Sequence, residues 1–215
     1  MSKKGCIIAF EGIHSSGKST LIENFITTHI IPNNIQFVMT DWNSSKILDE
    51  HVVHLKRNLE LDPYTLIFLE LADFSYRFEH IIKPAIEKGK LVLLDRSLFT
   101  TVTRGIVRDI PKEYLLNLIS LFPLPDICIY LDTQPEEALK RRINKKGCFE
   151  GYLSGSDYLD NKDLYINFLE YSRALRAEYK GLYKDTASRF LTIEQDKSVA
   201  VQCQDIWNNV EDILK

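Results

Sequence analysis

The sequence predicts an α/β protein built around a parallel sheet that is buried on both faces. Short apolar runs alternate along the chain with longer stretches of helical periodicity, which is the pattern of repeated βαβ units. The apolar runs lack strict alternation of apolar and polar residues, as expected for strands covered by helices on both sides. The candidate strands are Cys6–Phe10, Gln36–Thr40, Leu91–Leu94, Ile127–Leu131 and Phe190–Ile193.

Helices are expected between these strands and after the last of them. Pro63 and Pro135 suit the first turn of a helix, and Gly89 suits a helix end. The segment 147–160 carries glycines and small polar residues, so we expect a mobile loop there. The predicted helices are Lys18–Ile30, Ser45–Asn58, Pro63–Lys88, Lys112–Leu121, Pro135–Lys146, Lys162–Tyr183 and Ser198–Leu214.

Length and composition narrow the class of protein. The chain has 215 residues, with 27 lysines and arginines against 30 aspartates and glutamates, a formal charge of −3. This predicts a single domain, 1–215, with no general reason to bind nucleic acid. Four dispersed cysteines without a CxxC pair argue against a zinc knuckle and favour reduced thiols. No stretch approaches the ~20 apolar residues of a membrane span, so we expect a cytoplasmic protein without membrane partners.

The strongest motif lies between the first candidate strand and the first candidate helix. Residues 12–19, Gly-Ile-His-Ser-Ser-Gly-Lys-Ser, match the pattern G-x-x-x-x-G-K-[ST]. Glycines let backbone N–H groups surround a phosphate, and the helix start adds partial positive charge. This predicts a phosphate-binding loop (P-loop), with Lys18 on the β- and γ-phosphates and the Ser19 hydroxyl on Mg²⁺. The predicted ATP-binding residues are Gly12, Ile13, His14, Ser15, Ser16, Gly17, Lys18, Ser19 and Thr20.

An acid and an arginine follow the third candidate strand. Because parallel strands end at a common edge, we expect Asp95 beside the P-loop, where it can hold the Mg²⁺ shell. Arg96 would face the same crevice, where a guanidinium can bind a phosphate through two hydrogen bonds. The alternative is an Asp–Arg pair that only caps the next helix.

A basic cluster precedes the glycine-containing segment. Five cations lie within the seven residues from Lys140 to Lys146. Such a run is often a solvated helix face, but its position favours a lid over residues 140–160. Arg141 and Arg142 would then close over the phosphates and stabilise negative charge in the transition state.

The helix before the third strand carries Asp73 and Arg77 at i,i+4 spacing, so that they share a face and can pair. Phe74 could stack on a base, but an aromatic residue on a helix more often packs in a core. Taken alone, this stretch is interpreted as structural.

Together, several of these motifs resemble the thymidylate kinase family, and most closely its archaeal-type branch. The resemblance rests on residues 10–13 and 17–20, the pair Asp95-Arg96, residues 125–132 followed by Pro135-Glu136, and the stretches 41–45 and 72–77. It covers nearly the whole chain and is weakest at 145–159 and after Tyr183. It implies a three-layer α/β/α P-loop fold with a five-stranded parallel sheet, a lid and often a homodimer. Because the family transfers the γ-phosphate of ATP to dTMP, it also implies ATP and dTMP as partners and Mg²⁺ as cofactor.

The resemblance further implies roles on the acceptor side. Arg96 would hold the acceptor phosphate, and Arg77 would replace a helix arginine that the better-known branch carries at the position of Phe74. Phe74 would then lie near the base, and Trp42 would line the cleft or pack against the following helix. The residues assigned to the acceptor are Trp42, Phe74, Arg77, Arg96, Thr100, Thr101 and Arg104.

Three positions depart from the family's pattern. His14 replaces an acidic residue near the sugar, Ser97 stands where an aromatic residue usually follows Asp-Arg, and Gly105 stands where the base pocket usually has glutamine. The reaction type is therefore better defined than the acceptor.

Other functions stay open at this point. A deoxynucleoside kinase shares the P-loop and lid, and Asp41 could then take a proton from a sugar hydroxyl. A kinase of another nucleoside monophosphate is a second alternative. A GTP-dependent switch would normally show N-K-x-D, whereas residues 144–147 lack the acid. His51 and His54 share a helix face, but two histidines without a third ligand are interpreted as surface residues or dimer contacts.

Overall fold

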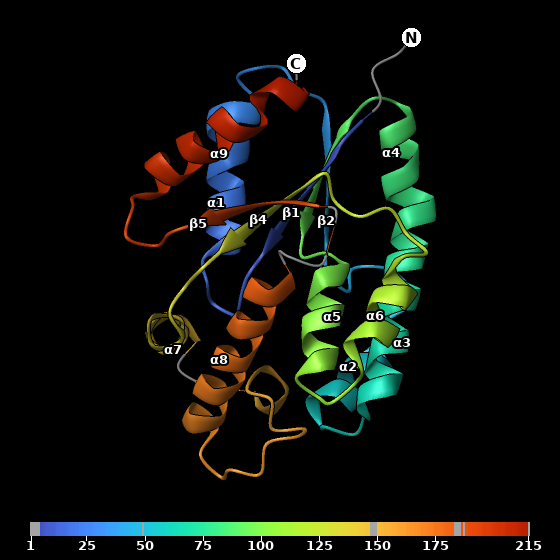
Figure 1. The fold of residues 1–215 in the computed structure, drawn as a ribbon, viewed down its shortest axis with the longest axis vertical. Helices are drawn as coiled ribbons and strands as arrows, with labels where there is room; N and C mark the ends of the chain where they lie inside the picture. Colours follow the sequence, from blue (N-terminus) through green and yellow to red (C-terminus); the bar gives the residue numbers. More distant parts are fainter. Residues whose placement is uncertain (1–4, 49, 147–149, 183–185, 187, 215) are drawn as a thin grey trace.

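The computed structural model describes residues 5–48, 50–146, 150–182, 186 and 188–214 (Figure 1). Its sheet is parallel and five-stranded, in the order β2-β3-β1-β4-β5. The predicted fold class is confirmed, and each predicted strand is displaced by at most one residue at either end. The strands are β1 Ile7–Glu11, β2 Phe37–Asp41, β3 Leu91–Asp95, β4 Ile127–Leu131 and β5 Arg189–Ile193.

The helices begin and end where local side chains permit. Asp62 accepts a hydrogen bond from the Thr65 backbone N–H at 3.0 Å, and Pro63 occupies the first turn of α3. A π-helical segment, Ile26–Ile30, continues α1, and another, Phe78–Ile82, joins α3 to α4. The helices are α1 Lys18–Phe25, α2 Glu50–Arg57, α3 Pro63–Arg77, α4 Lys83–Glu87, α5 Leu98–Ile106, α6 Lys112–Ile119, α7 Pro135–Lys146, α8 Leu164–Leu182 and α9 Val199–Leu214.

Helices cover both faces of the sheet. Figure 1 shows α1 and α9 together on one face, with α3, α5 and α8 on the other. Along β1, Ile8 and Phe10 belong to the core cluster beneath α1 and α9, whereas Ile7 and Ala9 belong to the opposite cluster. Because both faces are dry, the strand needs apolar residues at every position, which explains the missing alternation in the sequence.

The predicted helix Ser45–Asn58 starts too early. In the described residues, α2 begins at Glu50 and the preceding segment is a turn. Asn43 has a positive φ of 56°, the Ser44 hydroxyl donates to the Asp41 carbonyl at 2.6 Å, and the Ser45 N–H donates to Asp73 at 2.9 Å. These bonds satisfy backbone groups without a helix, through short polar side chains both near in sequence and on α3.

The predicted loop 147–160 is partly packed. Residues 147–149 lie outside the described part of the chain, but Gly151–Leu153 form a 3₁₀ turn, and Leu153 and Ser154 are buried. Gly155 has a φ of +72°, and a Cβ there would lie 3.0 Å from the ring of Tyr171 on α8. This close approach requires glycine and fixes the turn against α8.

The sheet order creates a crevice at the carboxyl edge. Strand β1 lies between β3 and β4, and the chain crosses from one side to the other there, which is where ligands bind in open α/β sheets. The register pairs Phe10 with Asp95, so the P-loop and the end of β3 are neighbours. Within the described residues, no helix is long and apolar enough to cross a membrane.

Candidate active site

The P-loop has the backbone that its glycines predict. Gly12 has a φ of +146°, and a Cβ there would lie 2.9 Å from the Leu131 carbonyl. Gly17 has a φ of +100° at the start of α1, and Ser15 also lies in the left-handed region. Replacing either glycine would strain the loop, because side chains disfavour these conformations. The loop is thus shaped to direct backbone N–H groups inward, as phosphate binding requires.

Lys18 is buried beneath this loop. Its Nζ donates to the Ile13 carbonyl at 3.0 Å and to the Ser16 hydroxyl at 3.2 Å. Burial, together with the charge of Arg96, lowers the pKa of Lys18 to about 7. An anion in the loop would reverse part of this shift, because opposite charge favours the protonated amine. The burial of Lys18 and the neighbouring Arg96 would therefore favour an anion in the loop.

Cations of the basic cluster lie beside the P-loop. A cavity of about 280 Å³ lies between the loop residues 15–20 and Arg141, Arg142 and Lys145 of α7. The Arg141 guanidinium donates to the Ser16 carbonyl at 2.9 Å, so α7 already touches the loop. The Arg142 Nε has no hydrogen-bond partner in the described part of the chain. Ile13 and Ser16 are buried in the loop, and Thr20 is exposed.

The predicted metal residues meet at the same edge. The Ser19 hydroxyl donates to the Asp95 carboxylate at 3.2 Å. Hydroxyl and carboxylate oxygens are the donors Mg²⁺ prefers, and it commonly keeps waters and phosphate oxygens as its other ligands. Within the described residues, no group of three or more His, Cys, Asp or Glu side chains is placed to hold a metal ion. The pair fits a metal that enters with a nucleotide.

Arg96 has a strained backbone. Its φ is +75°, and its side chain is only 8 % exposed. Strain at a non-glycine residue persists when the surroundings determine the geometry, and it concentrates at functional sites. The Arg96 Nη1 donates to the Gly12 carbonyl at 3.0 Å. The structure therefore brings the predicted acceptor arginine directly against the P-loop.

Sequence reasoning assigned no role to Glu11, the acid that precedes the P-loop. Its carboxylate is fully buried and accepts from the Ser97 N–H at 2.7 Å, the Thr100 hydroxyl at 2.7 Å and the Tyr179 hydroxyl at 2.8 Å. Glu11 thereby joins β1, α5 and α8 behind the crevice. Its position at the end of an apolar strand was the available signal. Ser97, noted only as a departure, caps α5 and serves this carboxylate.

The pair Asp73–Arg77 forms as predicted and is fully buried, with Nε and carboxylate oxygen 2.7 Å apart. The guanidinium lies 5.7 Å from the Trp42 ring centre, and its Nη2 has no partner among the residues described. For Phe74, which was predicted to lie near the base, the structure shows a different position. It is 2 % exposed and packs edge-on against Phe122, so the structure places it in the core rather than in the crevice.

A second buried acid, Glu70 of α3, contacts polar side chains of α5 and α2. It accepts from Arg104 at 2.8 Å and from the Thr101 hydroxyl at 3.2 Å, and the Lys56 amine lies 3.8 Å away. Burial, with Arg104 nearby, lowers the pKa of Lys56 to about 8. Sequence reasoning missed Glu70 and Lys56. Helical periodicity offered a signal for Glu70, which lies one turn before Phe74 on a buried face of α3.

The two histidines predicted to share a helix face belong to α2. The His54 ring lies 3.0 Å from the side-chain amide of Asn58, just after α2, and the side chain of His51 lies outside the described residues.

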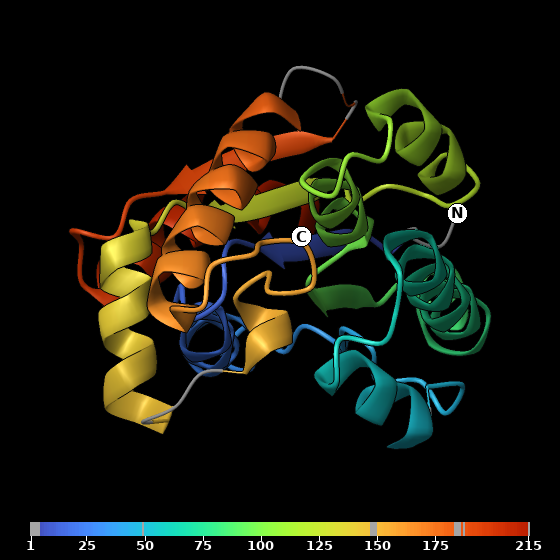
Figure 2. The same cartoon turned by 90° about the horizontal axis from the view of Figure 1, so that it is seen from below.

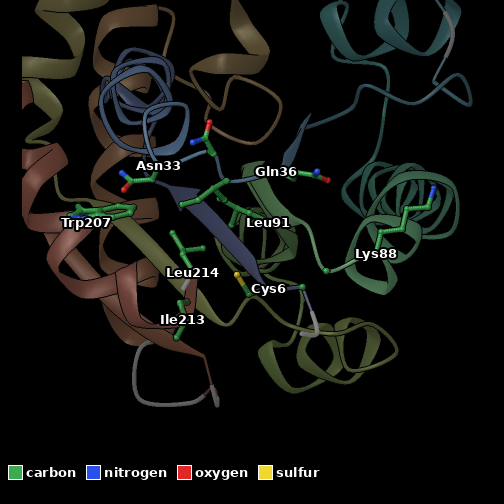
Figure 3. Close-up of a pocket in the computed structure, with 12 residues that line it drawn as sticks. Cys6, Asn33, Gln36, Lys88, Leu91, Trp207, Ile213 and Leu214 are labelled. Carbon is green, nitrogen blue, oxygen red and sulfur yellow. The ribbon is translucent and has the colours of Figure 1, made fainter. Parts of the chain in front are cut away.

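A second cavity, of about 670 Å³, is larger than the one beside the P-loop. It lies at the amino edge of the sheet, between Gln36, Leu91 and Trp207 (Figure 3). It is on the opposite edge from the P-loop and shares none of its residues.

A doubly wound parallel sheet, a P-loop at its carboxyl edge and cations converging on that loop define a P-loop nucleotide kinase. Comparison with known proteins narrows this class. The profile of the thymidylate kinase family matches residues 10–206, and the chain belongs to this family. The reaction of the family is the ATP-dependent phosphorylation of dTMP to dTDP, and the chain is an enzyme of that family.

Individual relatives agree with this assignment. A probable thymidylate kinase 2 from the archaeon Saccharolobus solfataricus is 29 % identical, over 98 % of this chain and 96 % of the relative. The thymidylate kinase of Caldanaerobacter subterraneus subsp. tengcongensis is 30 % identical, over 99 % of this chain and 98 % of the relative. The predicted family is thereby confirmed.

Proposed function

We propose that the crevice binds MgATP on the P-loop side and dTMP on the side of α3 and α5, and that it transfers the γ-phosphate between them. The contact between Arg96 and the Gly12 carbonyl carries this proposal. It holds a guanidinium at the boundary between the two sides, where an acceptor phosphate must approach a donor phosphate. Binding both phosphates in one orientation is a large part of catalysis for such a reaction.

The donor side is assigned to the P-loop and α7. Backbone N–H groups of the loop and Lys18 would hold the β- and γ-phosphates, and Ser19 with Asp95 would hold Mg²⁺. When bound, Mg²⁺ would neutralise charge on the phosphate oxygens. Arg141 and Arg142, as part of a lid over residues 140–160, would stabilise the negative charge on the equatorial oxygens of the transferred phosphoryl group. Figure 2 shows α7, in yellow, beside α8, in orange.

The acceptor requires no general base. A nucleoside monophosphate is ionised at neutral pH, so cations at the right positions suffice. Arg96 and Arg77 would hold its phosphate, with Trp42 beside Arg77. Thr101 and Arg104 would line the pocket for the nucleoside. Burial and the neighbouring Asp95 raise the pKa of Asp41, so this carboxylate is the group to examine if a nucleoside is phosphorylated instead.

The test is an ADP-release assay with ATP and Mg²⁺ against separate acceptors. We expect turnover with dTMP, weaker turnover with dUMP and other monophosphates, and none with thymidine or without acceptor. Adding EDTA in excess over Mg²⁺ should abolish turnover. Turnover with thymidine but not dTMP would instead identify a nucleoside kinase with Asp41 as its base. We place this reaction in the cytoplasm, in agreement with the reduced thiols expected from four dispersed cysteines.

We further propose that the chain forms a homodimer through α3 and α6. The rings of Tyr64 on α3 and Tyr114 on α6 lie 6.3 Å apart, and further exposed apolar side chains lie on α3 and just beyond the end of α6. An exposed group of this kind is typical of a protein interface. The exposed fractions are Tyr64 48 %, Phe68 49 %, Tyr114 39 % and Leu121 77 %.

Replacing Phe68 by aspartate is expected to convert the dimer into a monomer, because the interface would bury an unpaired charge. The measurement is light scattering coupled to size-exclusion chromatography, for a chain of 24.9 kDa. Val201→Asp on α9 is the matched control, since Val201 is 46 % exposed on a different helix. A wild-type monomer, or equal masses for all three proteins, would contradict this interface.

A further inference from the structure

One hydrogen bond joins the P-loop to the acceptor side. The Arg104 Nη2 lies 3.2 Å from the His14 Nε2. A guanidinium can only donate, so Nε2 must be the unprotonated nitrogen and the proton of the neutral ring must lie on Nδ1. The contact therefore exists only when the imidazole is neutral.

The surroundings favour this neutral form. Burial lowers the pKa of His14 well below its ordinary value, and the charges of Arg96 and Arg104 lower it further. Lys18 and Lys56 act in the same direction. The carboxylates nearby serve other groups, since Glu70 accepts from Arg104, and Asp95 from Ser19. A protonated His14 would lose its acceptor nitrogen and add positive charge to a site already rich in cations.

Arg104 is held at both ends. Its Nη1 donates to Glu70 of α3 at 2.8 Å, whereas its Nη2 donates to His14 of the P-loop. Arg104 is 7 % exposed; its bond to Glu70 is buried and its bond to His14 is partly buried. Buried charged donors are costly to leave unpaired, which means that losing either acceptor should release the guanidinium from its position. His14 is therefore the element of the P-loop that fixes this acceptor-side cation.

We propose that His14 is a positioning residue: as a neutral hydrogen-bond acceptor it fixes Arg104 and thereby sets the affinity for the acceptor nucleotide. The role rests on the proposed function, because Arg104 must line the acceptor pocket. It also gives a physical role to the histidine that stands here in place of the family's acidic residue. A residue in the loop that binds ATP acts on the other substrate, through a side chain of α5.

Two nearly isosteric variants separate this role from a structural one. His14→Gln keeps an oxygen that can accept from Arg104, whereas His14→Met fills similar space without a strong acceptor. We expect His14→Met to raise the KM for dTMP about tenfold, the order of a lost hydrogen bond to a charged group. His14→Gln should stay within about threefold of the wild type. The difference between the two variants in the KM for dTMP is the result that a general loss of loop structure would not produce, because such a loss would raise the KM for ATP by a similar factor in both.

A double-mutant cycle with Arg104→Met completes the test. If His14 acts through Arg104, His14→Met should add nothing to the KM effect of Arg104→Met. Additive effects, or equal KM values for His14→Gln and His14→Met, would overturn the proposal. Turnover by the wild type separates the test of the proposed function from the test of His14. A wild type that is inactive with dTMP refutes the proposed function, and the cycle is then run with whichever monophosphate is phosphorylated. If none is phosphorylated, both proposals fall.

Discussion

Replacing Arg96 by methionine is expected to lower kcat about a hundredfold to a thousandfold, the usual cost of removing one preorganised donor from a charged transition state. Arg96 donates to the Gly12 carbonyl at 3.0 Å, so its guanidinium lies where the transferred phosphoryl group would carry dispersed negative charge. The expected loss falls on kcat at saturating ATP and dTMP, because the interaction strengthens as charge develops. Steady-state kinetics with both substrates measures it.

Two further variants make this result specific. Arg96→Lys retains a charge without the planar fork and should recover only part of kcat. Arg173→Met removes an exposed arginine that pairs with Glu136 at 2.6 Å, away from the P-loop, and should leave kcat unchanged. Because Arg96 has a φ of +75°, thermal unfolding must confirm that each variant is folded. A kcat for Arg96→Met within about threefold of the wild type would refute the catalytic role.

Replacing Arg77 by methionine is expected to destabilise the protein by about 3–5 kcal/mol, the typical cost of leaving a buried charge without its partner. Both side chains of the Asp73–Arg77 pair are fully buried, and within the described residues the other hydrogen bond to the Asp73 carboxylate comes from the Ser45 N–H. That single neutral donor cannot compensate a carboxylate in a dry environment. Urea denaturation measures the free energy of unfolding directly.

The chain offers a closely matched control for this effect. Lys83 and Glu79 form an ion pair of the same i,i+4 spacing at 2.9 Å, but their side chains are about half exposed, 48 % and 54 %. Lys83→Met should therefore cost less than about 1 kcal/mol. Replacing both members of the buried pair, in Asp73→Leu/Arg77→Met, should restore part of the lost stability. Equal losses for Arg77→Met and Lys83→Met would show that burial does not control the strength of these pairs.

The binding loop illustrates what can be predicted from sequence. Gly12 and Gly17 adopt the positive φ values that the motif requires, and Lys18 begins the next helix where the pattern places it. Such features depend on neighbouring residues, because steric limits on φ and ψ act locally. The helix start predicted at Ser45 was wrong because the contact that holds this residue is not local. Its backbone bonds to Asp73, a residue remote in sequence, which no local pattern reveals.

The acceptor side depends on the assembled fold. Glu11 meets Tyr179 only because β1 packs beneath α8, across 168 positions of the chain. Glu70, Arg104 and His14 likewise come from three separate elements. Phe74 could have faced a base or the core, and its contact with Phe122 decided for the core.

The sequence by itself determined the α/β fold, the P-loop and the family, because hydrophobic periodicity and glycine geometry act over short spans. Only the tertiary structure decided which buried charges pair and which face the crevice. The reason is that a buried ion is stable only with a partner in the right place. In this chain, most of those partners are supplied by another strand or helix.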